Sequence, residues 1–524
     1  MYSGFDPIRL ELYRNLLSSI SEEMGGALCR SAFSSNIKER RDFSCAVFDS
    51  NGNMVAQAAH IPVHLGAMPL SVQSAIEHFE IAEGDSILIN DPYAGGTHLP
   101  DFTLVSPVYI GDSLSFFVAN RAHHSDVGGM TPGSMPISRH IVQEGIRIPP
   151  VKLIDSGHMN TDILSMILAN VRTPVERKGD LDAQIAANHI GQKRLTEMTI
   201  KYGLKDVNQY MSKLQDYSER VMRQRLIDIP NGHYVATDFL DNDGLSNTPV
   251  PIQVAITITD DSATVDFSGS SPQVEGSVNA VYSITLSAIF YVFRSLITDE
   301  IPTNSGCLRP IKIIVPTRSV VNAQFPAAVA GGNVETSQRI VDVLLRALSE
   351  ASPQTIPAAS SGTMNNLTIG GLKNEKDFAY YETIGGGMGA RYYKDGISAI
   401  QTHMTNTLNT PIEAIETTYP FQIDKYAIRR GSGGTGRKYG GDGIIREFRL
   451  LTTAEVTMLS ERRETAPYGL QGGTAGKIGK NTLIRSDQKI SLGGKFSLTA
   501  RPNDIFQIEP PGGGGHGKPD ELNS

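Results

Sequence analysis

The first clear pattern of apolar positions along the chain lies between residues 6 and 30. Asp6 followed by Pro7 predicts a helix start there, because aspartate accepts hydrogen bonds from free N–H groups and proline suits the first helical turn. Apolar side chains then recur every four residues, and we expect them to form one buried stripe. The stripe consists of Ile8, Leu12, Leu16, Ile20, Met24 and Leu28.

A strand-like alternation of apolar and polar residues follows this helix. Residues 43–59 predict a β-hairpin that turns at Asn51-Gly52, a favoured two-residue turn. Residues 86–90 predict another strand, and residues 102–124 predict a second hairpin. The pattern then becomes helical over residues 161–227.

The sequence Pro230-Asn231-Gly232 interrupts the helical pattern, and we place a domain boundary there. The fold class is therefore predicted as α+β and multi-domain, with an N-terminal region at 1–230 and a β-rich region at 231–524. Two helices are expected in the second region, at about 279–297 and 336–350, before strands punctuated by glycine-rich turns. The closing residues 510–524 are expected to be flexible unless something binds them.

Composition excludes several classes of function. The formal net charge of the 524 residues is −8 and no dense run of Lys or Arg occurs, which argues against a nucleic-acid partner. Cys29, Cys45 and Cys307 lie too far apart for a thiolate zinc motif or a disulfide framework, so a reducing cytoplasm is expected. No signal peptide and no stretch of about 20 apolar residues is found, so we expect no membrane partner.

Two segments near the predicted strands contain residues that bind metals. DPYAGGTHLPDF holds His98 and Asp101, and RAHHSDVGG holds His123. Adjacent strands could bring both segments to one end of a sheet. Imidazole with carboxylate suits Zn²⁺, Mn²⁺ or Fe²⁺, and such an ion acidifies a bound water. Asp42 is the weaker candidate for a fourth ligand, with Glu39 and Asp91 as further possibilities; the alternative is that all are polar loop residues.

His124 and Asp126 follow His123 and are the candidates for catalytic residues. Consecutive residues at a strand end point to opposite sides, so His124 faces away from the metal if His123 faces it. His124 then acts as a proton shuttle or orienting group, or it packs in the core.

Glycine-rich segments form a second class of candidate site at 327–339, 382–392, 429–443 and 511–517. Free N–H groups beside arginine or at a helix start can hold phosphate. The substrate- or phosphate-binding candidates are Gly331, Gly332, Asn333, Arg339 and Arg462. Tight turns and ordinary salt bridges are the alternative interpretations. No Walker motif, no GxSxG nucleophile motif and no cysteine with a nearby histidine is present.

The chain resembles the hydantoinase B/oxoprolinase family, which includes N-methylhydantoinase B, the C-terminal part of 5-oxoprolinase and a large subunit of acetone and acetophenone carboxylases. The resemblance extends from about residue 5 to about residue 518. It rests on KERRDFSCAVFD, HIPVHLGAMPLSV, NDPYAGGTHLPDF, ANRAHHSDVGG, VDFSGSSPQVEGSVNA, PTNSGCLRP, AGGNVETSQR, SERRETAPYGLQGG and PPGGGGHG.

The resemblance implies a metal-dependent catalytic B subunit of an ATP-dependent cyclic amide hydrolase. It implies an A subunit with an acetate-and-sugar-kinase-like fold that binds ATP and Mg²⁺ and phosphorylates the substrate carbonyl, in a hetero-oligomer such as A2B2. By motif, the implied metal ligands are Asp42, His98, Asp101 and His123. The alternatives are a subunit of an ATP-dependent ketone carboxylase and a non-catalytic scaffold for the A subunit.

Overall fold

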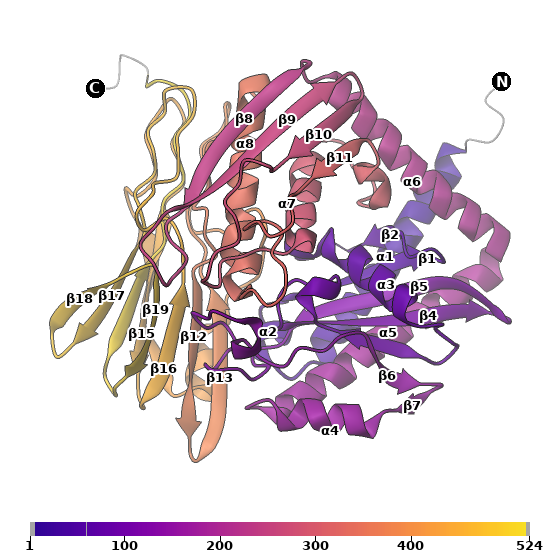
Figure 1. Ribbon diagram of the computed structural model, residues 1–524, viewed down its shortest axis with the longest axis horizontal. Helices are drawn as coiled ribbons and strands as arrows, with labels where there is room; N and C mark the ends of the chain where they lie inside the picture. The colour runs from indigo at the N-terminus through magenta and orange to yellow at the C-terminus, as the bar shows by residue number, and fades with distance from the viewer. Residues whose placement is uncertain (1–5, 59, 520–524) are drawn as a thin grey trace.

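The computed structural model describes residues 6–58 and 60–519 (Figure 1). Helix α1 spans Pro7–Ser31, and the Asp6 carboxylate accepts from the N–H groups of Ile8 and Arg9, which confirms the predicted start. The predicted stripe is wrong in its first half: Ile20, Met24 and Leu28 are buried, but Ile8 is 81% and Leu12 41% exposed. An α-helix has about 3.6 residues per turn, so a repeat of four drifts by about 40° per step and leaves the core face.

The N-terminal region is built on a seven-stranded sheet in which all neighbours are antiparallel, in the order β2-β1-β5-β4-β3-β6-β7. Both predicted hairpins are confirmed, as β1–β2 and β4–β5. The strands are β1 (Phe43–Asp49), β2 (Met54–Gln57), β3 (Ser86–Ile89), β4 (Asp101–Ile110), β5 (Ser113–His123), β6 (Val151–Asp155) and β7 (His158–Met159).

Alternate residues of this sheet enter two different cores. Cys45 and Val47 pack with α1 and α5, whereas Ala46 and Phe48 join the larger core on the other face. The predicted helical stretch is confirmed as three helices. The helices of this region are α2 (Ser35–Lys38), α3 (Ala67–His78), α4 (Thr161–Ala169), α5 (Pro174–Tyr202) and α6 (Leu204–Ile227). Among the helices of the described residues, none is long and apolar enough to cross a membrane.

Beyond residue 230 a four-stranded sheet packs on helix α8 (Ser337–Ala351), which packs in turn on α7 (Tyr282–Ser295). Its order is β11-β10-β9-β8, and the strands are β8 (Gly232–Leu240), β9 (Val250–Thr259), β10 (Ser262–Asp266) and β11 (Ile311–Ile314). Both predicted helices are confirmed, as α7 (Tyr282–Ser295) and α8 (Ser337–Ala351), and Figure 1 shows them in the middle of the molecule. The largest core contains Val72 and Val265, so it includes residues from both sides of 230.

Two further sheets form the C-terminal part, left in Figure 1, and share one core that includes Leu367, Val456, Phe448 and Phe506. Their orders are β13-β12-β16-β19 and β14-β15-β20-β17-β18. This mixture of helices and several sheets confirms the α+β, multi-domain class. The elements are β12 (Asn366–Lys373), β13 (Lys376–Thr383), α9 (Ile412–Thr418), β14 (Phe421–Arg429), β15 (Gly443–Leu450), β16 (Ala454–Leu459), β17 (Lys480–Arg485), β18 (Gln488–Leu492), β19 (Lys495–Ala500) and β20 (Ile505–Glu509).

Four glycine-rich segments lie side by side and form a unit that we call the glycine bundle, made of residues 384–391, 431–443, 469–477 and 510–517. Their backbones are joined by hydrogen bonds such as Gly513 N–H to the Gly441 carbonyl, 2.9 Å. Residues 510–517 are buried, so the expectation of a flexible tail is wrong for this segment, while 520–524 lie outside the described residues. The glycines let these backbones approach more closely than side chains would allow.

Candidate functional site

The strand register brings the predicted metal-binding residues together. Asp101 begins β4 and pairs directly with His123 at the end of β5. His123 N–H donates to the Asp42 carbonyl (3.0 Å), which places the residue before β1 beside them. His98 lies in the turn before β4, where its carbonyl accepts from Asp101 N–H (3.1 Å). The expectation that both sequence segments meet at one sheet end is confirmed.

Three donor atoms form a nearly equilateral triangle. His98 Nε2 lies 3.2 Å from Asp101 Oδ1, His123 Nδ1 lies 3.3 Å from the same oxygen, and the two nitrogens are 3.2 Å apart. A tetrahedral site with metal–ligand bonds of about 2.0–2.1 Å has edges of about 3.3 Å. All three residues are buried, and Asp101 Oδ1 has no hydrogen-bond partner in the described part of the chain. The donor set therefore fits a divalent metal.

Asp42 is buried beside this group but does not join it. The donor atoms of His98, Asp101 and His123 all lie within 4.8 Å of one another, and the group does not include Asp42. Burial raises the pKa of Asp42, while His123 and Arg40 oppose that shift. Its carboxylate is thus close enough to interact with the site, and its role as fourth ligand stays a prediction.

The Asp101 carboxylate is oriented by residues that contact its second oxygen. Thr97 Oγ1 donates to Oδ2 at 2.5 Å, and His64 Nε2 lies 3.4 Å from the same atom. His64 Nδ1 is in turn 2.9 Å from Ser44 Oγ. Burial alone would raise the pKa of Asp101, but the neighbouring histidines hold it well below its usual range.

His64 was missed by the sequence reasoning. It lies at the end of a short 3-10 helix, η1 (Pro62–His64), before α3. The segment HIPVH carried a signal, because two histidines four residues apart are spaced like side chains on one helix face. The segment is not part of a predicted strand, so strand pairing could not place His64 beside Asp101.

The C-terminal half also reaches the site, through Tyr381 on β13. The Tyr381 ring stacks on His123 with centroids 4.4 Å apart and planes 11° apart. Arg40 covers the Tyr381 ring at 4.9 Å, and the Tyr381 hydroxyl donates to Asn366 Oδ1 at 2.9 Å. Asn366 Nδ2 donates to Glu335, whose pKa burial raises to about 8. These contacts fix the plane of the His123 ring.

The structure does not bring the two catalytic candidates into the donor group. His124 Nε2 lies 2.9 Å from Gln184 Oε1, and its ring stacks on Phe102, so it faces away from the metal ligands as the alternation of strand residues requires. Burial lowers the pKa of His124 to about 4. Asp126 accepts from the N–H groups of Gly128 and Gly133 and pairs with Arg172 at 3.0 Å, contacts that order a loop.

The glycine candidates for phosphate binding use their N–H groups within the protein. Gly331 N–H donates to the Ser277 carbonyl (2.8 Å) and Gly332 N–H to the Val329 carbonyl (3.0 Å). Asn333 lies in the π-helix η5 (Gly332–Thr336). The N–H groups of Val329 and Ala330, just before these glycines, donate to Glu144, whose pKa burial raises to about 7.

The two arginine candidates are buried and paired with carboxylates. Arg339 contacts Asp342 at 2.8 Å, and Arg462 contacts Asp238 and Asp342 at 2.6 Å each. The structure therefore places both guanidinium groups in an ion-pair network that joins β8, α8 and the segment after β16. Their carboxylate partners are Asp238 and Asp342, and not the metal-binding candidate Asp101.

Some curated relatives of this chain are more than twice as long as it is, and others are of similar length. A 5-oxoprolinase of Dictyostelium discoideum is 42% identical over 528 residues, which cover 99% of this chain and 41% of that protein. The chain thus spans less than half the length of that relative. A protein of Pseudomonas sp. strain NS671, described as the B subunit of a D-/L-hydantoinase, is 33% identical over 536 residues, covering 98% of this chain and 90% of the relative.

Two solved structures share the fold. An ATP-dependent caprolactamase from Pseudomonas jessenii superposes with a TM-score of 0.92 at 28% identity, covering 98% of this chain and 92% of that chain. Nucleotide-free acetone carboxylase superposes with a TM-score of 0.90 at 19% identity, covering 98% and 76%, which shows a common fold.

The family model described as hydantoinase B/oxoprolinase matches residues 6–519, nearly the whole chain. The resemblance found in the sequence motifs is therefore confirmed, and so is the predicted enzyme class at the level of the family. This chain belongs to the hydantoinase B/oxoprolinase family.

Proposed function

We propose that this chain is the metal-dependent catalytic B subunit of an ATP-dependent cyclic amide hydrolase. The triangle of His98, Asp101 and His123 donor atoms carries this proposal, because it matches the spacing that a tetrahedral divalent metal requires. The names of its relatives agree with it, since 5-oxoprolinase, hydantoinase and caprolactamase all refer to cyclic amides.

His98, Asp101 and His123 would hold the metal, with Asp42 as the fourth ligand, and the donor types suit Zn²⁺, Mn²⁺ or Fe²⁺. Such an ion supplies Lewis acidity, which polarises a carbonyl group and lowers the pKa of water. The protein itself orients the ligands: Thr97 and His64 direct the second oxygen of Asp101, and Tyr381 holds the His123 ring. The buried setting excludes bulk water, which strengthens electrostatic effects there.

The ATP-dependent step belongs to a partner in this proposal. A cyclic amide resists attack because resonance stabilises its C–N bond, and phosphorylation of the carbonyl oxygen removes that resistance by creating a leaving group. This chain has no Walker motif. We therefore assign ATP and Mg²⁺ to a hydantoinase A-type subunit, in an assembly such as A2B2. The hydantoinase relative, itself described as one component of an enzyme, agrees with this division.

The direct test is a coupled assay with the purified chain, its A subunit, ATP and a panel of hydantoins and lactams. We expect ADP release that depends on the cyclic amide and matches ring opening. His98→Ala should abolish both, whereas His189→Ala, which changes an exposed histidine on α5, should not. Equal turnover in His98→Ala and the parent chain would contradict the proposal.

A ketone carboxylase subunit is the second candidate, favoured by the shared fold with acetone carboxylase. It predicts that ATP consumption requires bicarbonate and a ketone, whereas the hydrolase predicts no dependence on bicarbonate. Running the same assay with and without bicarbonate separates the two. A non-catalytic scaffold, the third candidate, predicts that the purified chain binds no metal.

A further inference from the structure

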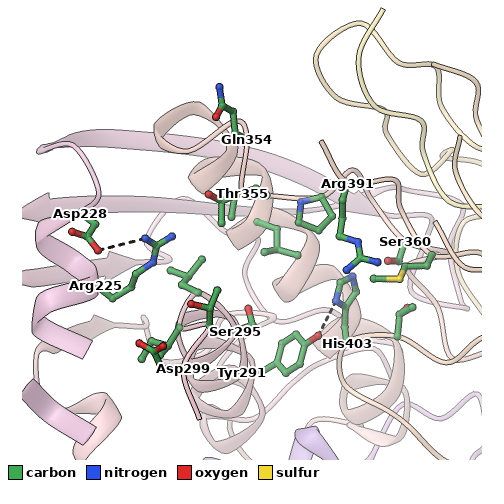
Figure 2. A pocket seen from close by; sticks show the side chains of 18 of the residues that line it. Arg225, Asp228, Tyr291, Ser295, Asp299, Gln354, Thr355, Ser360, Arg391 and His403 are labelled. Carbon is green, nitrogen blue, oxygen red and sulfur yellow. Dashed lines mark hydrogen bonds and ion pairs between the residues drawn. The ribbon is translucent and has the colours of Figure 1, made fainter. Parts of the chain in front are cut away.

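A cavity of about 370 Å³ lies at the glycine bundle, and none of the metal-binding candidates lines it. Its volume is within the range of about 300–1,000 Å³ that is usual for small-molecule sites. Its charged and titratable lining includes Arg437, His516 and Lys518. Gln354 separates it from a larger cavity of about 1620 Å³, since it lines both, and Figure 2 shows Gln354 at the edge of the larger one.

The His516 ring is buried without a hydrogen-bond partner. His516 is 0% exposed, and neither Nδ1 nor Nε2 has a hydrogen-bond partner among residues 6–58 and 60–519. Its backbone is fixed, because its N–H and carbonyl both bond to Lys438 at 2.9 Å. Its ring meets the Tyr392 ring edge-on, with centroids 5.9 Å apart. Buried polar groups are rarely left without a partner, so this ring indicates a ligand in the cavity that it lines.

Two cations line the same cavity. The Arg437 guanidinium covers the Tyr392 ring at 4.5 Å and donates to the Tyr392 carbonyl at 3.1 Å. Within the part of the chain that the structure describes, neither Arg437 nor Lys518 forms an ion pair with a carboxylate. The described lining of the cavity contains no Asp or Glu. Positive charge without a counter-charge favours an anionic ligand.

Two glycines in the left-handed conformation make room for these cations. Gly472 has a φ of 91° and Gly517 a φ of 78°. A Cβ on Gly472 would lie 2.5 Å from Lys518 Cγ, and a Cβ on Gly517 would lie 3.1 Å from Arg437 Cβ. The aliphatic parts of both cations therefore lie against bare backbone. This contact holds them at the cavity although Arg437 and Lys518 are exposed.

The electrostatics of His516 indicate the same kind of ligand. Burial and the neighbouring charge of Arg437 lower the pKa of His516, although the Pro353 carbonyl acts in the opposite direction. Arg437 and His516 are therefore close enough to interact. A bound anion would oppose the shift and favour the protonated ring, which donates from both nitrogens.

We propose that Arg437, His516 and Lys518 form a binding site for a phosphate group, either free inorganic phosphate or the phosphate of a nucleotide. A phosphate group carries a charge of about −1.5 to −2 near pH 7 and accepts several hydrogen bonds at once, which matches two cations and an imidazole. A carboxylate carries only one charge. The site is separate from the metal centre, so its ligand is not the cyclic amide, and the inference goes beyond the proposed function.

Calorimetric titration of the full chain with inorganic phosphate, ADP and acetate, at constant ionic strength, tests this site without the A subunit. Phosphate and ADP should bind more tightly than acetate. Tighter binding of ADP than of phosphate identifies a nucleotide as the source of the phosphate group, and equal binding identifies free phosphate. Both outcomes support the site.

The variants should separate this site from the rest of the surface. Arg437→Gln and Lys518→Gln should each weaken phosphate binding about three- to tenfold, as expected for charges that are partly exposed to solvent. His516→Phe, which keeps a ring but removes both nitrogens, should weaken it about tenfold. The matched control is Arg430→Gln, an exposed arginine that does not line the cavity, which should change affinity less than about twofold.

His98→Ala should leave phosphate binding unchanged, because the site is separate from the metal centre. The proposal is overturned if no phosphate or ADP binds, if acetate binds as tightly, or if phosphate binding is lost in His98→Ala. It is also overturned if Arg437→Gln and Lys518→Gln bind phosphate as tightly as Arg430→Gln. Unchanged thermal unfolding shows that a variant is folded, and the two exposed cations keep the test decisive if His516→Phe is not.

Discussion

The two carboxylate oxygens of Asp101 have different surroundings. Oδ2 is contacted by Thr97 and His64, whereas Oδ1 faces the two ligand nitrogens and has no hydrogen-bond partner among the described residues. A carboxylate fixed in this way is already oriented before an ion binds, since partners of the ligands set their direction. The assignment of Oδ1 as a metal ligand therefore depends on Thr97 and His64.

Removing this orientation should weaken metal binding without abolishing it. Thr97→Val and His64→Phe each delete one contact to Oδ2 while keeping a similar volume. We expect each to lower the affinity for Zn²⁺ about 10- to 100-fold, the range found for such partners, as measured by competition with a chromogenic chelator. His189→Ala is the control. If both variants bind Zn²⁺ as tightly as the parent chain, the contacts to Oδ2 do not orient the Asp101 carboxylate for metal binding.

At this scale the sequence predicts some of the site but not all of it. His98, Asp101 and His123 could be found because they adjoin strands whose pairing follows from the hairpin pattern. Tyr381 could not, because it reaches His123 from a strand more than 250 positions further along the chain, and no local periodicity reports such a contact.

Among the elements, β8 and α8 are joined by a buried ion-pair network of Asp238, Arg339, Asp342 and Arg462. The sequence suggested Arg339 and Arg462 as phosphate ligands. In the structure each has carboxylate partners, and a buried charge that loses its partner is costly. These arginines hold β8, α8 and the segment after β16 together.

Asp238→Asn should therefore destabilise the fold. We expect the free energy of unfolding to fall by about 3–5 kcal/mol, as when one partner of a buried pair is removed, in urea unfolding followed by circular dichroism. Asp424→Asn, which breaks an exposed pair with Arg449, should change it by about 1 kcal/mol or less. A loss for Asp238→Asn no larger than for Asp424→Asn would contradict the network's role.

The ion pairs of Asp238 also predict how the stability of the fold depends on pH. Burial alone would raise the pKa of Asp238, but Arg462 and Arg339 lower it from 3.8 to about 2 in the folded chain. The folded state thus binds fewer protons between these values, so the stabilisation is complete above pH 3.8 and is lost as the pH falls to about 2. Stability measured against pH should be less steep over this window in Asp238→Asn. Parallel curves for the variant and the parent chain would refute the assignment.

Local sequence patterns predicted where helices and strands lie better than they predicted which residues of these elements are buried. The hairpins and α7 and α8 follow from turns and apolar spacing within the segment itself. The stripe on α1 failed because a repeat of four drifts around the helix, so its first members lie off the buried face: Ile8 is exposed whereas Leu10 and Tyr13 are buried.

Over the whole molecule, the glycine bundle connects the last described residues of the chain with three distant segments. A glycine-rich sequence has the composition of a flexible linker, so the tail was predicted as mobile. Its order comes from backbone hydrogen bonds between segments far apart in sequence, such as Ala390 N–H to the Gly514 carbonyl at 2.9 Å. Sequence patterns within a short window do not contain that information.

Adding one methyl group inside the bundle should destabilise the protein. A Cβ on Gly387 would lie 1.9 Å from the Gly441 carbonyl oxygen, whereas a Cβ on Gly493 would meet nothing closer than 3.9 Å. We expect Gly387→Ala to lower the free energy of unfolding by about 1–3 kcal/mol or more and Gly493→Ala to have little effect, as measured by urea unfolding. Similar losses for both variants would show that close backbone packing is not the cause.

Metal content tests most directly whether His98, Asp101 and His123 form a metal centre. After expression in metal-replete medium, elemental analysis of the purified chain should find about one divalent ion per chain, as a site built from one set of ligands predicts. His98→Ala should lose most of that metal, and His189→Ala should keep it. A chain without bound metal, or an equal metal content in His98→Ala, would contradict the proposed centre.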